Sequence, residues 1–291
     1  MNIWQALFLA LLQGSTELFP VSSLGHAVLV PRLLGWDYNQ ADPTFLPYLT
    51  LLHLGTAGAL LLVFRDDWVK IIRGFLRAVY RGRLGTDANE RLGILIFIGT
   101  IPTGLAGAFF KSDLEKLFAS PRAAAIFLII NAGIMGTGEV LRRRDERKRA
   151  RDAVAGLKPE QREAAYETEA DLTLPRAAIV GVSQSLALFP GISRSGSTIT
   201  AGLLAGLKHE SAARFSFLLA TPIILAAGVL EVPTLFTAGA PLLTYLAGAV
   251  VAAVTAYLSA RFLLRYFRFG RLDPFAAYCA VIGIVGLVIT R

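Results

Sequence analysis

Six apolar stretches recur along this chain, and each approaches the roughly 20 residues that a helix needs to cross the hydrocarbon core of a bilayer. They cover residues 47–64, 92–110, 123–141, 212–230, 242–260 and 274–290. Hydrophobic residues make up 54% of the chain and charged residues only 17%, a balance that excludes an ordinary soluble domain. The sequence therefore predicts an all-α polytopic membrane protein, because the stretches lack the alternating pattern of a membrane β-barrel.

Lysine and arginine are concentrated in three segments between these stretches. The basic segments are 65–90, 142–176 and 261–273, and the connections with few positive charges are 31–46, 111–122 and 231–241. Because positive residues favour the cytoplasmic side of a membrane, the three basic segments are predicted to be cytoplasmic. This topology also accounts for the net charge of +8, so no nucleic-acid partner is expected.

Two further apolar segments are interrupted by polar residues. Residues 1–35 contain G-S-T-E-L-F-P-V-S-S-L-G-H (14–26), and residues 177–209 contain P-G-I-S-R-S-G-S-T (190–198). With the basic segments inside, each interrupted segment must begin and end on one side of the membrane. We therefore expect two re-entrant pairs of half-helices, the first entering from outside and the second from inside, with both chain termini outside.

The two halves of the chain also repeat each other. The motif Q-G-S-T-E-L-F-P-V-S-S (13–23) is echoed by Q-S-L-A-L-F-P-G-I-S-R-S (184–195). We predict one membrane domain, 1–291, made of repeat 1 (1–141), a cytoplasmic loop (142–176) and repeat 2 (177–291). Each repeat is a re-entrant helix hairpin plus three transmembrane helices, and three crossings give the repeats inverted topology. Such repeats bring broken helices together near the midplane, where substrate sites form.

The second interrupted segment has the composition of an anion site. Arg194 carries a permanent charge on a planar fork that suits phosphate oxygens, and Ser193, Ser195 and Thr198 add hydroxyl donors. The half-helix that follows would point free N–H groups at the same place. The alternative is a structural loop in which Arg194 pairs with a nearby carboxylate.

The first interrupted segment supplies complementary groups. Glu17 can act as a base or hold a divalent cation, and Gln13 lies one helical turn earlier with an amide oxygen. Ser23 is the preferred nucleophile, with Glu17 or His26 as its base, and direct attack by His26 or by a metal-bound water are the alternatives. The structural alternative is Glu17 paired with Arg194 and His26 bonded to a backbone carbonyl.

Other polar residues carry less information. His53 lies on an apolar stretch and is as compatible with packing as with lining a cavity, while His209 is expected at a solvated edge. The chain has no phosphate-binding G-x-x-x-x-G-K-[ST] loop, so ATP-driven function has no support.

The interrupted segments resemble the signature regions of the undecaprenyl pyrophosphate phosphatases, the bacitracin-resistance family of bacterial membrane enzymes. That family pairs E/Q-x-x-x-E and P-V-S-S-x-G-H with P-G-x-S-R-S-x-x-T. Here the motifs read Q-G-S-T-E (13–17), P-V-S-S-L-G-H (20–26) and P-G-I-S-R-S-G-S-T (190–198). The resemblance extends through H-L-G-T (53–56) and R-F-S-F-L-L-A-T-P (214–222), so it covers nearly the whole chain.

The resemblance implies hydrolysis of the C55 isoprenyl pyrophosphate to the monophosphate and phosphate, which recycles the lipid carrier of cell-wall synthesis. It also implies a Mg²⁺ or Ca²⁺ ion, and a place in the bacterial inner (plasma) membrane with the active site toward the outer face. Position by position, the implied catalytic residues are Glu17, Ser23, His26 and Arg194. The implied phosphate-binding residues are Ser22, Ser193, Arg194, Ser195 and Thr198, and the implied metal ligands are Gln13 and Glu17. Gln13 stands where the family often has glutamate, and an amide can ligate a metal but cannot serve as a base.

The main rival is a transporter or flippase for an isoprenyl phosphate or other anionic cargo, built on the same inverted repeats. A lipid-phosphatase superfamily with S-G-H and S-R-x-x-x-x-x-H motifs fits less well, because no histidine follows Arg194 at that spacing. The partners expected are the isoprenyl pyrophosphate and membrane lipid, and a homodimer is compatible with the sequence.

Overall fold

Membrane-length helices dominate the computed structural model, which describes residues 1–36, 44–82, 87–110, 117, 120–152, 166–233, 235 and 241–290, except for the side chains of 149–152 and 170. These residues form eleven α-helices and two short 3₁₀ helices, and the described part of the chain holds no strand. One isolated bridge pairs Glu167 with Leu207. The all-α prediction is therefore confirmed.

Five helices are long and apolar enough to cross a membrane. They are α3 (Phe45–Val63), α5 (Ala88–Phe109), α7 (Pro121–Asp152), α11 (His209–Glu231) and α13 (Leu242–Tyr266). The apolar helix α14 (Asp273–Ile289) has 17 residues, which rise about 25 Å. These six helices coincide with the six apolar stretches, and the chain is a multi-pass membrane protein.

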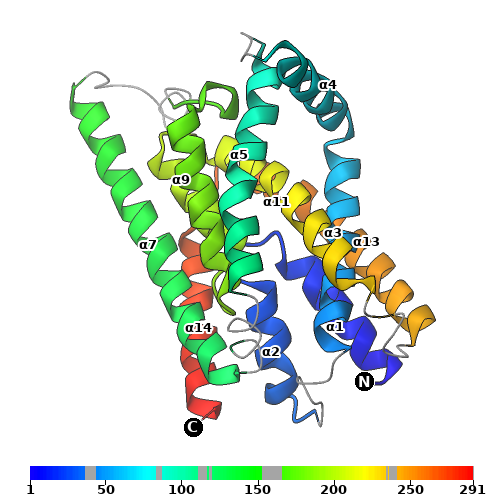
Figure 1. Cartoon of the computed structure of the whole chain (residues 1–291). Coiled ribbons are helices and arrows are strands. Elements are labelled where there is room, and N and C mark those ends of the chain that lie inside the picture. The colour runs from blue at the N-terminus through cyan, green and yellow to red at the C-terminus, as the bar shows by residue number, and fades with distance from the viewer. Residues whose placement is uncertain are drawn as a thin grey trace.

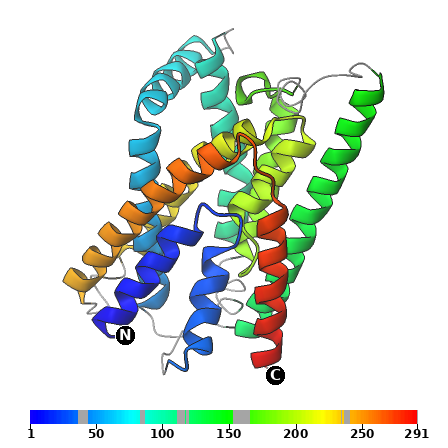
Figure 2. The same cartoon turned by 180° about the vertical axis from the view of Figure 1, so that it is seen from behind.

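Both interrupted segments form broken helix pairs. The first is α1 (Ile3–Thr16) followed by α2 (Ser23–Leu33), and the second is α9 (Leu174–Gln184), the 3₁₀ helix η2 (Ser185–Leu188) and α10 (Arg194–Leu204), with η1 (Glu169–Asp171) just before it. Figures 1 and 2 show α1 and α2 turning back in the middle of the molecule toward the end where α14 finishes. The α9–α10 pair reaches the middle from the opposite end, where α4 lies.

The basic segments differ from expectation because they are largely helical rather than loops. Residues 65–81 form α4 (Arg65–Arg81), α7 continues through the charged run to Asp152, and α13 continues to Tyr266. Arginine, lysine and glutamate are good helix formers, so a helix has no local reason to stop where the apolar stretch ends. Residues 83–86 and 153–165 lie outside the described residues, as do 111–116, 118 and 119 of the predicted outside segment 111–122.

A buried ionic cluster ties α7 to α11 and to the turn before α14. Glu139 is fully buried and accepts hydrogen bonds from the backbone N–H of Leu272 and from Nε2 of His209, each at 2.9 Å. Arg271 reaches the other carboxylate oxygen at 3.3 Å. The expectation that His209 is solvated was wrong, because the charged residue that attracts it lies 70 positions earlier in the chain.

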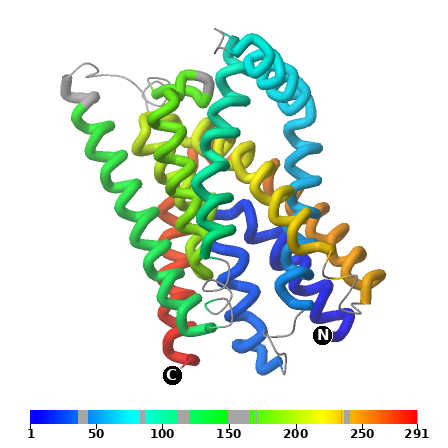
Figure 3. Tube along the Cα trace, in the orientation of Figure 1, coloured from blue at the N-terminus to red at the C-terminus, as the bar shows by residue number. Residues whose placement is uncertain are grey.

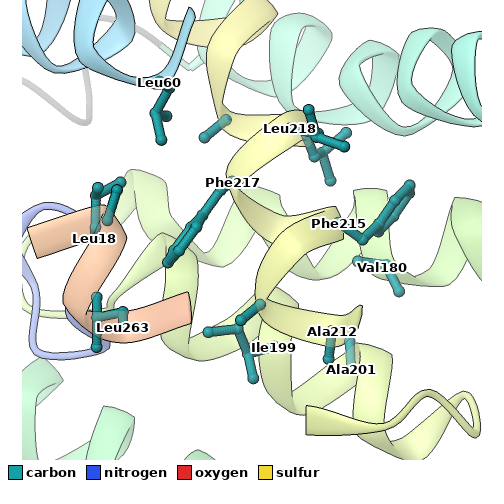
Figure 4. Close-up of a cluster of buried hydrophobic side chains, with 14 of the residues drawn as sticks. Leu18, Leu60, Val180, Ile199, Ala201, Ala212, Phe215, Phe217, Leu218 and Leu263 are labelled. Carbon is teal, nitrogen blue, oxygen red and sulfur yellow. The ribbon is translucent and has the colours of Figure 1, made fainter. Parts of the chain in front are cut away.

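The hydrophobic core is centred on α11. Phe215 and Phe217 are fully buried; Figure 4 shows Phe215 beside Val180, and Phe217 on the side where Leu18 and Leu263 lie. The most extensive helix contacts are α7 with α14 and α3 with α13, which lie side by side in Figure 3. Helices from both halves of the chain thus enclose the two broken pairs.

Candidate active site

The turns at which the two broken pairs reverse direction, residues 17–22 and 189–193, meet beside a cavity of about 240 Å³. We call these turns the first and second tips. One wall is polar and contains Glu17, Ser22, Ser23, His53, Ser193 and Arg194. A second polar group comes from Thr103 and Gln184, and the remaining lining is mostly apolar, including Leu46, Leu49, Leu188, Ile223, Ile224 and Ala227. A cavity with one polar wall and an otherwise apolar lining suits a ligand with a charged head and a hydrocarbon tail.

Glu17 is the centre of the polar wall. It caps the C-terminus of α1 and is buried, with 7% of its surface exposed. Its Oε2 accepts hydrogen bonds from Nε2 of Gln13 at 2.9 Å and from Oγ of Ser23, and its Oε1 pairs with the guanidinium of Arg194. The first and second motifs, 177 residues apart at this pair, therefore converge on one carboxylate.

His53 of α3 is a fourth group on Glu17, although the sequence left it open between packing and lining a cavity. Its Nδ1 donates to the carbonyl of Leu49 at 2.7 Å, and its Nε2 lies 3.0 Å from Oε2 of Glu17. The carbonyl of Leu49 can only accept, so Nδ1 carries a proton. The contact between Nε2 and the Glu17 carboxylate then needs a proton of its own, on either the imidazole or the carboxyl group. The H-L-G-T motif was a signal for this residue, but its contact with Glu17 is decided by how α3 packs on α1.

Ser22 and Ser23 sit at the turn that starts α2. Ser22 is the N-cap, and its Oγ accepts from the backbone N–H of Gly25 at 3.2 Å. Its φ of 67° is the one positive value at a non-glycine residue in the described part of the chain. Such strain persists only where the surroundings enforce it, and it is common at active sites. The turn places the Ser23 hydroxyl on Glu17.

His26 faces away from this cavity. Its Nδ1 bonds the carbonyl of Ser22 at 2.7 Å and its Nε2 lies 2.8 Å from the hydroxyl of Tyr278 on α14. The two rings stack with centroids 5.6 Å apart. His26 is not among the residues that line the cavity, so its predicted catalytic role stays a prediction, and the contacts describe a residue that holds the strained turn.

The P-G-I-S-R-S loop places Arg194 at the first turn of α10. Ser193 is the N-cap, and its Oγ accepts from the backbone N–H of Gly196 at 3.1 Å. Ser195 donates to the carbonyl of Phe19 at 3.1 Å, which joins the second tip to the first. Arg194 Nη2 is on Glu17, while Nη1 is buried with no hydrogen-bond partner among the described residues. The Nη1 group of the guanidinium is therefore the donor that a ligand could engage.

Asn131 of α7 joins the two tips and was not foreseen. It is fully buried, its Nδ2 donates to the carbonyl of Pro20 at 3.2 Å, and its Oδ1 accepts from the backbone N–H of Ser193 at 3.1 Å. A single amide thus fixes the distance between the turns that carry Ser23 and Arg194. No pattern around Asn131 signals this, because it lies within an ordinary apolar stretch.

The predicted site residues therefore fall into two groups. Glu17, Ser22, Ser23, Ser193 and Arg194 line the cavity. Gln13, His26, Ser195 and Thr198 do not: Gln13 bonds Glu17 from behind, and Thr198 lies 2.6 Å from the hydroxyl of Ser216. Arg194 does pair with Glu17, as the structural alternative expected, but the pair lies open to a cavity.

Gly191 allows the second broken pair to pack against α7, which gives a stability prediction. Its φ is 109°, and a Cβ there would lie 2.8 Å from Cβ of Phe127 and 2.9 Å from N of Leu128. We expect Gly191→Ala to destabilise the fold by about 2 kcal/mol or more, measured as a lower Tm in detergent. The matched control is Gly136→Ala on α7, where a Cβ meets nothing within 4 Å. Gly136→Ala should leave Tm unchanged or raise it. Equal Tm values for wild type and Gly191→Ala would contradict the expected steric clash at residue 191.

Comparison with known proteins shows which proteins this chain is similar to. A protein of Acidiphilium cryptum named undecaprenyl-diphosphatase is 47% identical over 292 aligned residues, covering 98% of this chain and 96% of its own length. A Mycobacterium avium protein of the same name is 47% identical over 293 residues, with the same coverage. Undecaprenyl-diphosphatase 2 of Chromobacterium violaceum is 44% identical over 294 residues and covers 99% of both chains. Residues 6–285 match the family described as bacitracin resistance protein BacA, and the chain belongs to that family.

Proposed function

We propose that this protein is a membrane phosphatase that hydrolyses undecaprenyl pyrophosphate to undecaprenyl phosphate and inorganic phosphate. The observation that carries the proposal is the convergence of Glu17, Ser23 and Arg194 on one cavity. The identity of the substrate is proposed from the names of the relatives called undecaprenyl-diphosphatase, which align over nearly the full length. In a bacterial inner membrane this activity recycles the lipid carrier of cell-wall synthesis.

Substrate binding uses both ends of the cavity. The apolar lining, with Leu46, Leu188 and Ile223 among its members, accommodates the first isoprene units. The pyrophosphate lies at the polar wall, against the free prong of Arg194 and the N-termini of α2 and α10. Helix N-termini and arginine are the groups that bind phosphate best in a dry site. Ser22 and Ser193 line the same wall and add hydroxyl groups, while Ser195 and Thr198 support the loop.

In the reaction that the geometry favours, Oγ of Ser23 attacks the terminal phosphorus. The bond from that phosphorus to the bridging oxygen breaks, and undecaprenyl phosphate leaves with its electron pair. The Ser23 proton passes to Oε2 of Glu17, its hydrogen-bond partner. Water then attacks the phosphoserine, Ser23 recovers a proton through Glu17, and inorganic phosphate is released. Arg194 holds Oε1 of Glu17 with Nη2 and offers Nη1 to the phosphate, so Oε2 is the oxygen that accepts the proton.

A divalent cation, Mg²⁺ or Ca²⁺, fits the residues behind Glu17. Oε1 of Gln13 is buried and has no hydrogen-bond partner among the described residues, and the Glu17 carboxylate is its neighbour. Mg²⁺ commonly takes one or two protein oxygens and completes its shell with water and substrate phosphates. When held by the cavity-lining carboxylate of Glu17, with Gln13 as its second protein ligand, the ion would neutralise charge on the phosphoryl group.

Metal removal tests this assignment. We expect EDTA to lower phosphate release and Gln13→Ala to raise the Mg²⁺ concentration for half-maximal activity by about tenfold, because one ligand is lost. Gln184→Ala is the comparison variant: Gln184 is a buried glutamine of the second half whose Oε1 also has no partner among the described residues, but its Nε2 lies 3.4 Å from the hydroxyl of Thr103 instead of on Glu17. It should leave the Mg²⁺ dependence unchanged. Full activity in EDTA would remove the metal from the mechanism.

The inverted-repeat architecture is supported by how the two tips share the cavity. When the L-F-P triplets 18–20 and 188–190 are aligned, Glu17 corresponds to Ala187, and Arg194 corresponds to Leu24. All four residues line the cavity. We infer two inverted repeats, 1–141 and 177–291, within a single domain 1–291. The first repeat contributes the acidic residue of the site, Glu17, and the second contributes the basic residue, Arg194.

Sidedness follows from the charged ends of the helices. The end with α4 and the arginine-rich part of α7 is assigned to the cytoplasm by its positive charge. The other end, with the start of α1 and the last turn of α14, is then outside, and we propose that the active site is reached from that side.

Labelling checks this orientation. A membrane-impermeant maleimide should label Arg122→Cys in intact cells, but Arg144→Cys only after permeabilisation. Both positions are exposed. The native Cys279 is fully buried and provides little background. The reverse pattern would invert the topology.

The function itself is tested by phosphate release from undecaprenyl pyrophosphate by the purified protein. We expect release by wild type and its loss in Glu17→Gln. A folded wild type that releases no phosphate but moves isoprenyl phosphate across liposome membranes would favour the transporter instead. The same preparation, examined by mass photometry in detergent, reports whether the chain forms the homodimer that we propose as its assembly.

A further inference from the structure

A second cavity lies at the opposite end of the membrane helices from the chain termini. It has a volume of about 470 Å³ and lies between the end of α3, the start of α4 and the last turns of α13. Four arginines line it, together with one aspartate, one tyrosine and three aliphatic residues: Arg65, Arg261, Arg265, Arg268, Asp66, Tyr257, Leu62, Val63 and Leu264. No residue of this cavity takes part in the phosphatase site.

Two of the four arginines have acidic partners among the described residues, and the other two do not. Counting Asp66 on the lining and Glu210 beside Arg268, the cluster keeps two positive charges. Arg65 is 3.8 Å from Asp66, Arg268 pairs with Glu210 at 3.2 Å, and Arg265 has no ion pair in the described part of the chain. The positive-inside rule explains why arginines occur at this end of the protein. It does not explain why α4 and α13, distant from each other in the chain, direct them into one cavity.

Helix α4 shows that this cavity lies at the level of a membrane surface. Its apolar residues recur three or four positions apart and are exposed: Val69, Ile72, Leu76 and Val79 are each about half exposed or more. Its basic residues form an adjacent face, with Lys70, Arg73, Arg77 and Arg81. A helix with an uncovered apolar stripe beside a basic face lies in the bilayer interface, with the stripe among acyl chains. Arg65, the first residue of α4, belongs to the cavity, so the cavity is at headgroup depth.

We propose that this cavity binds the phosphate of an anionic phospholipid from the leaflet on that side. Arginine forks suit phosphate oxygens, and basic pockets between transmembrane helices at this level are typical lipid headgroup sites. The acyl chains would leave along the apolar surface that adjoins the arginines. There Leu62 is 65% exposed, Leu258 59% and Phe262 55%. This site is independent of the phosphatase activity and of its substrate.

The test is a titration of purified protein in detergent with phosphatidylglycerol, followed by native mass spectrometry and by the rise in Tm. Phosphatidylcholine is the zwitterionic comparison, and inorganic phosphate the free-anion comparison. We expect saturable binding of phosphatidylglycerol, which weakens at least tenfold in Arg261→Gln/Arg265→Gln. The matched control Lys70→Gln/Arg73→Gln removes two charges from the basic face of α4 outside the cavity and should bind within twofold of wild type.

Three outcomes would overturn the proposal. They are equal loss of binding in both double variants, no loss in the cavity variant, or displacement of the lipid by millimolar inorganic phosphate. Equal loss would indicate diffuse surface charge, and displacement a free-anion site. Arg265→Gln alone breaks no ion pair among the described residues, so it provides a second variant if the double one is poorly folded. Phosphate release from undecaprenyl pyrophosphate reports folding separately, because none of these residues lines the catalytic cavity.

Discussion

Replacing Arg194 with glutamine is expected to lower kcat for phosphate release by about a thousandfold. The guanidinium is enclosed, with 12% of its side chain exposed, so water cannot replace it. Its Nη1 is a buried donor without a partner among the described residues, and Arg194 lines the cavity. Negative charge that develops on the transferred phosphoryl group would lose its fixed cation. Phosphate release under saturating substrate measures the loss.

The lysine variant separates charge from shape at this position. Arg194→Lys keeps a positive charge beside Glu17 but cannot contact carboxylate and phosphate with two planar prongs, so we expect a loss of about a hundredfold. Because the substituted ammonium group would still compensate the buried carboxylate, the Tm of this variant should stay close to that of wild type. Arg73→Gln, which changes an exposed arginine of α4, controls for net charge. Near-normal activity in Arg194→Gln would show that the Arg194–Glu17 pair is structural only.

Replacing Ser23 with alanine is expected to lower kcat by about 10³-fold or more, because the proposed nucleophile is lost while the phosphate site remains. KM should change little, since Arg194 and the helix N-termini are intact. Wild type quenched during turnover should carry a phosphate on Ser23, detectable by peptide mass spectrometry. Ser183→Ala provides the matched control, because that hydroxyl bonds a helix carbonyl at 2.7 Å and lies outside the cavity lining. Substantial turnover by Ser23→Ala would assign the attack to water.

Two histidine variants locate the proton carrier in the same assay. Because Nε2 of His53 shares a proton with Glu17, His53→Gln should lower kcat by about tenfold and alter its pH dependence between about pH 5 and 8. His26→Gln should act through the turn, since both ring nitrogens are engaged by Ser22 and Tyr278. Tyr278→Phe removes one of those contacts and should reproduce part of the His26 effect. A phosphorylated His26 in place of Ser23 would reverse these roles.

Most of the helix pattern was predictable, because it depends on local properties of the chain. Apolar length identified the five membrane-length helices and the shorter α14, and Pro20 and Pro190 with their neighbouring glycines and serines identified both breaks. The ends were predicted less well. Nothing in the charged run after residue 141 stops a helix, so α7 continues to Asp152. The positive-inside rule locates charge relative to the membrane but is silent on whether a charged segment is coil or helix.

The composition of the site was also largely predictable, while its contacts were not. The motifs named Glu17, Ser23 and Arg194, and these three do meet. Sequence reasoning gave His26 more weight than His53, because His26 is three residues from Ser23. In the structure that part of α2 is rotated onto Tyr278 of α14, whereas His53 on α3 faces Glu17.

The sequence by itself determined that this chain spans a membrane, where its helices break, and which residue types collect at the breaks. These properties depend on hydrophobic length and backbone chemistry within a few residues. Only the tertiary structure decided that His53 rather than His26 contacts Glu17, that Asn131 holds the two tips together, and that α4 and α13 enclose a basic cavity. The reason is physical: the face that a helix turns inward depends on its packing against helices distant in the chain.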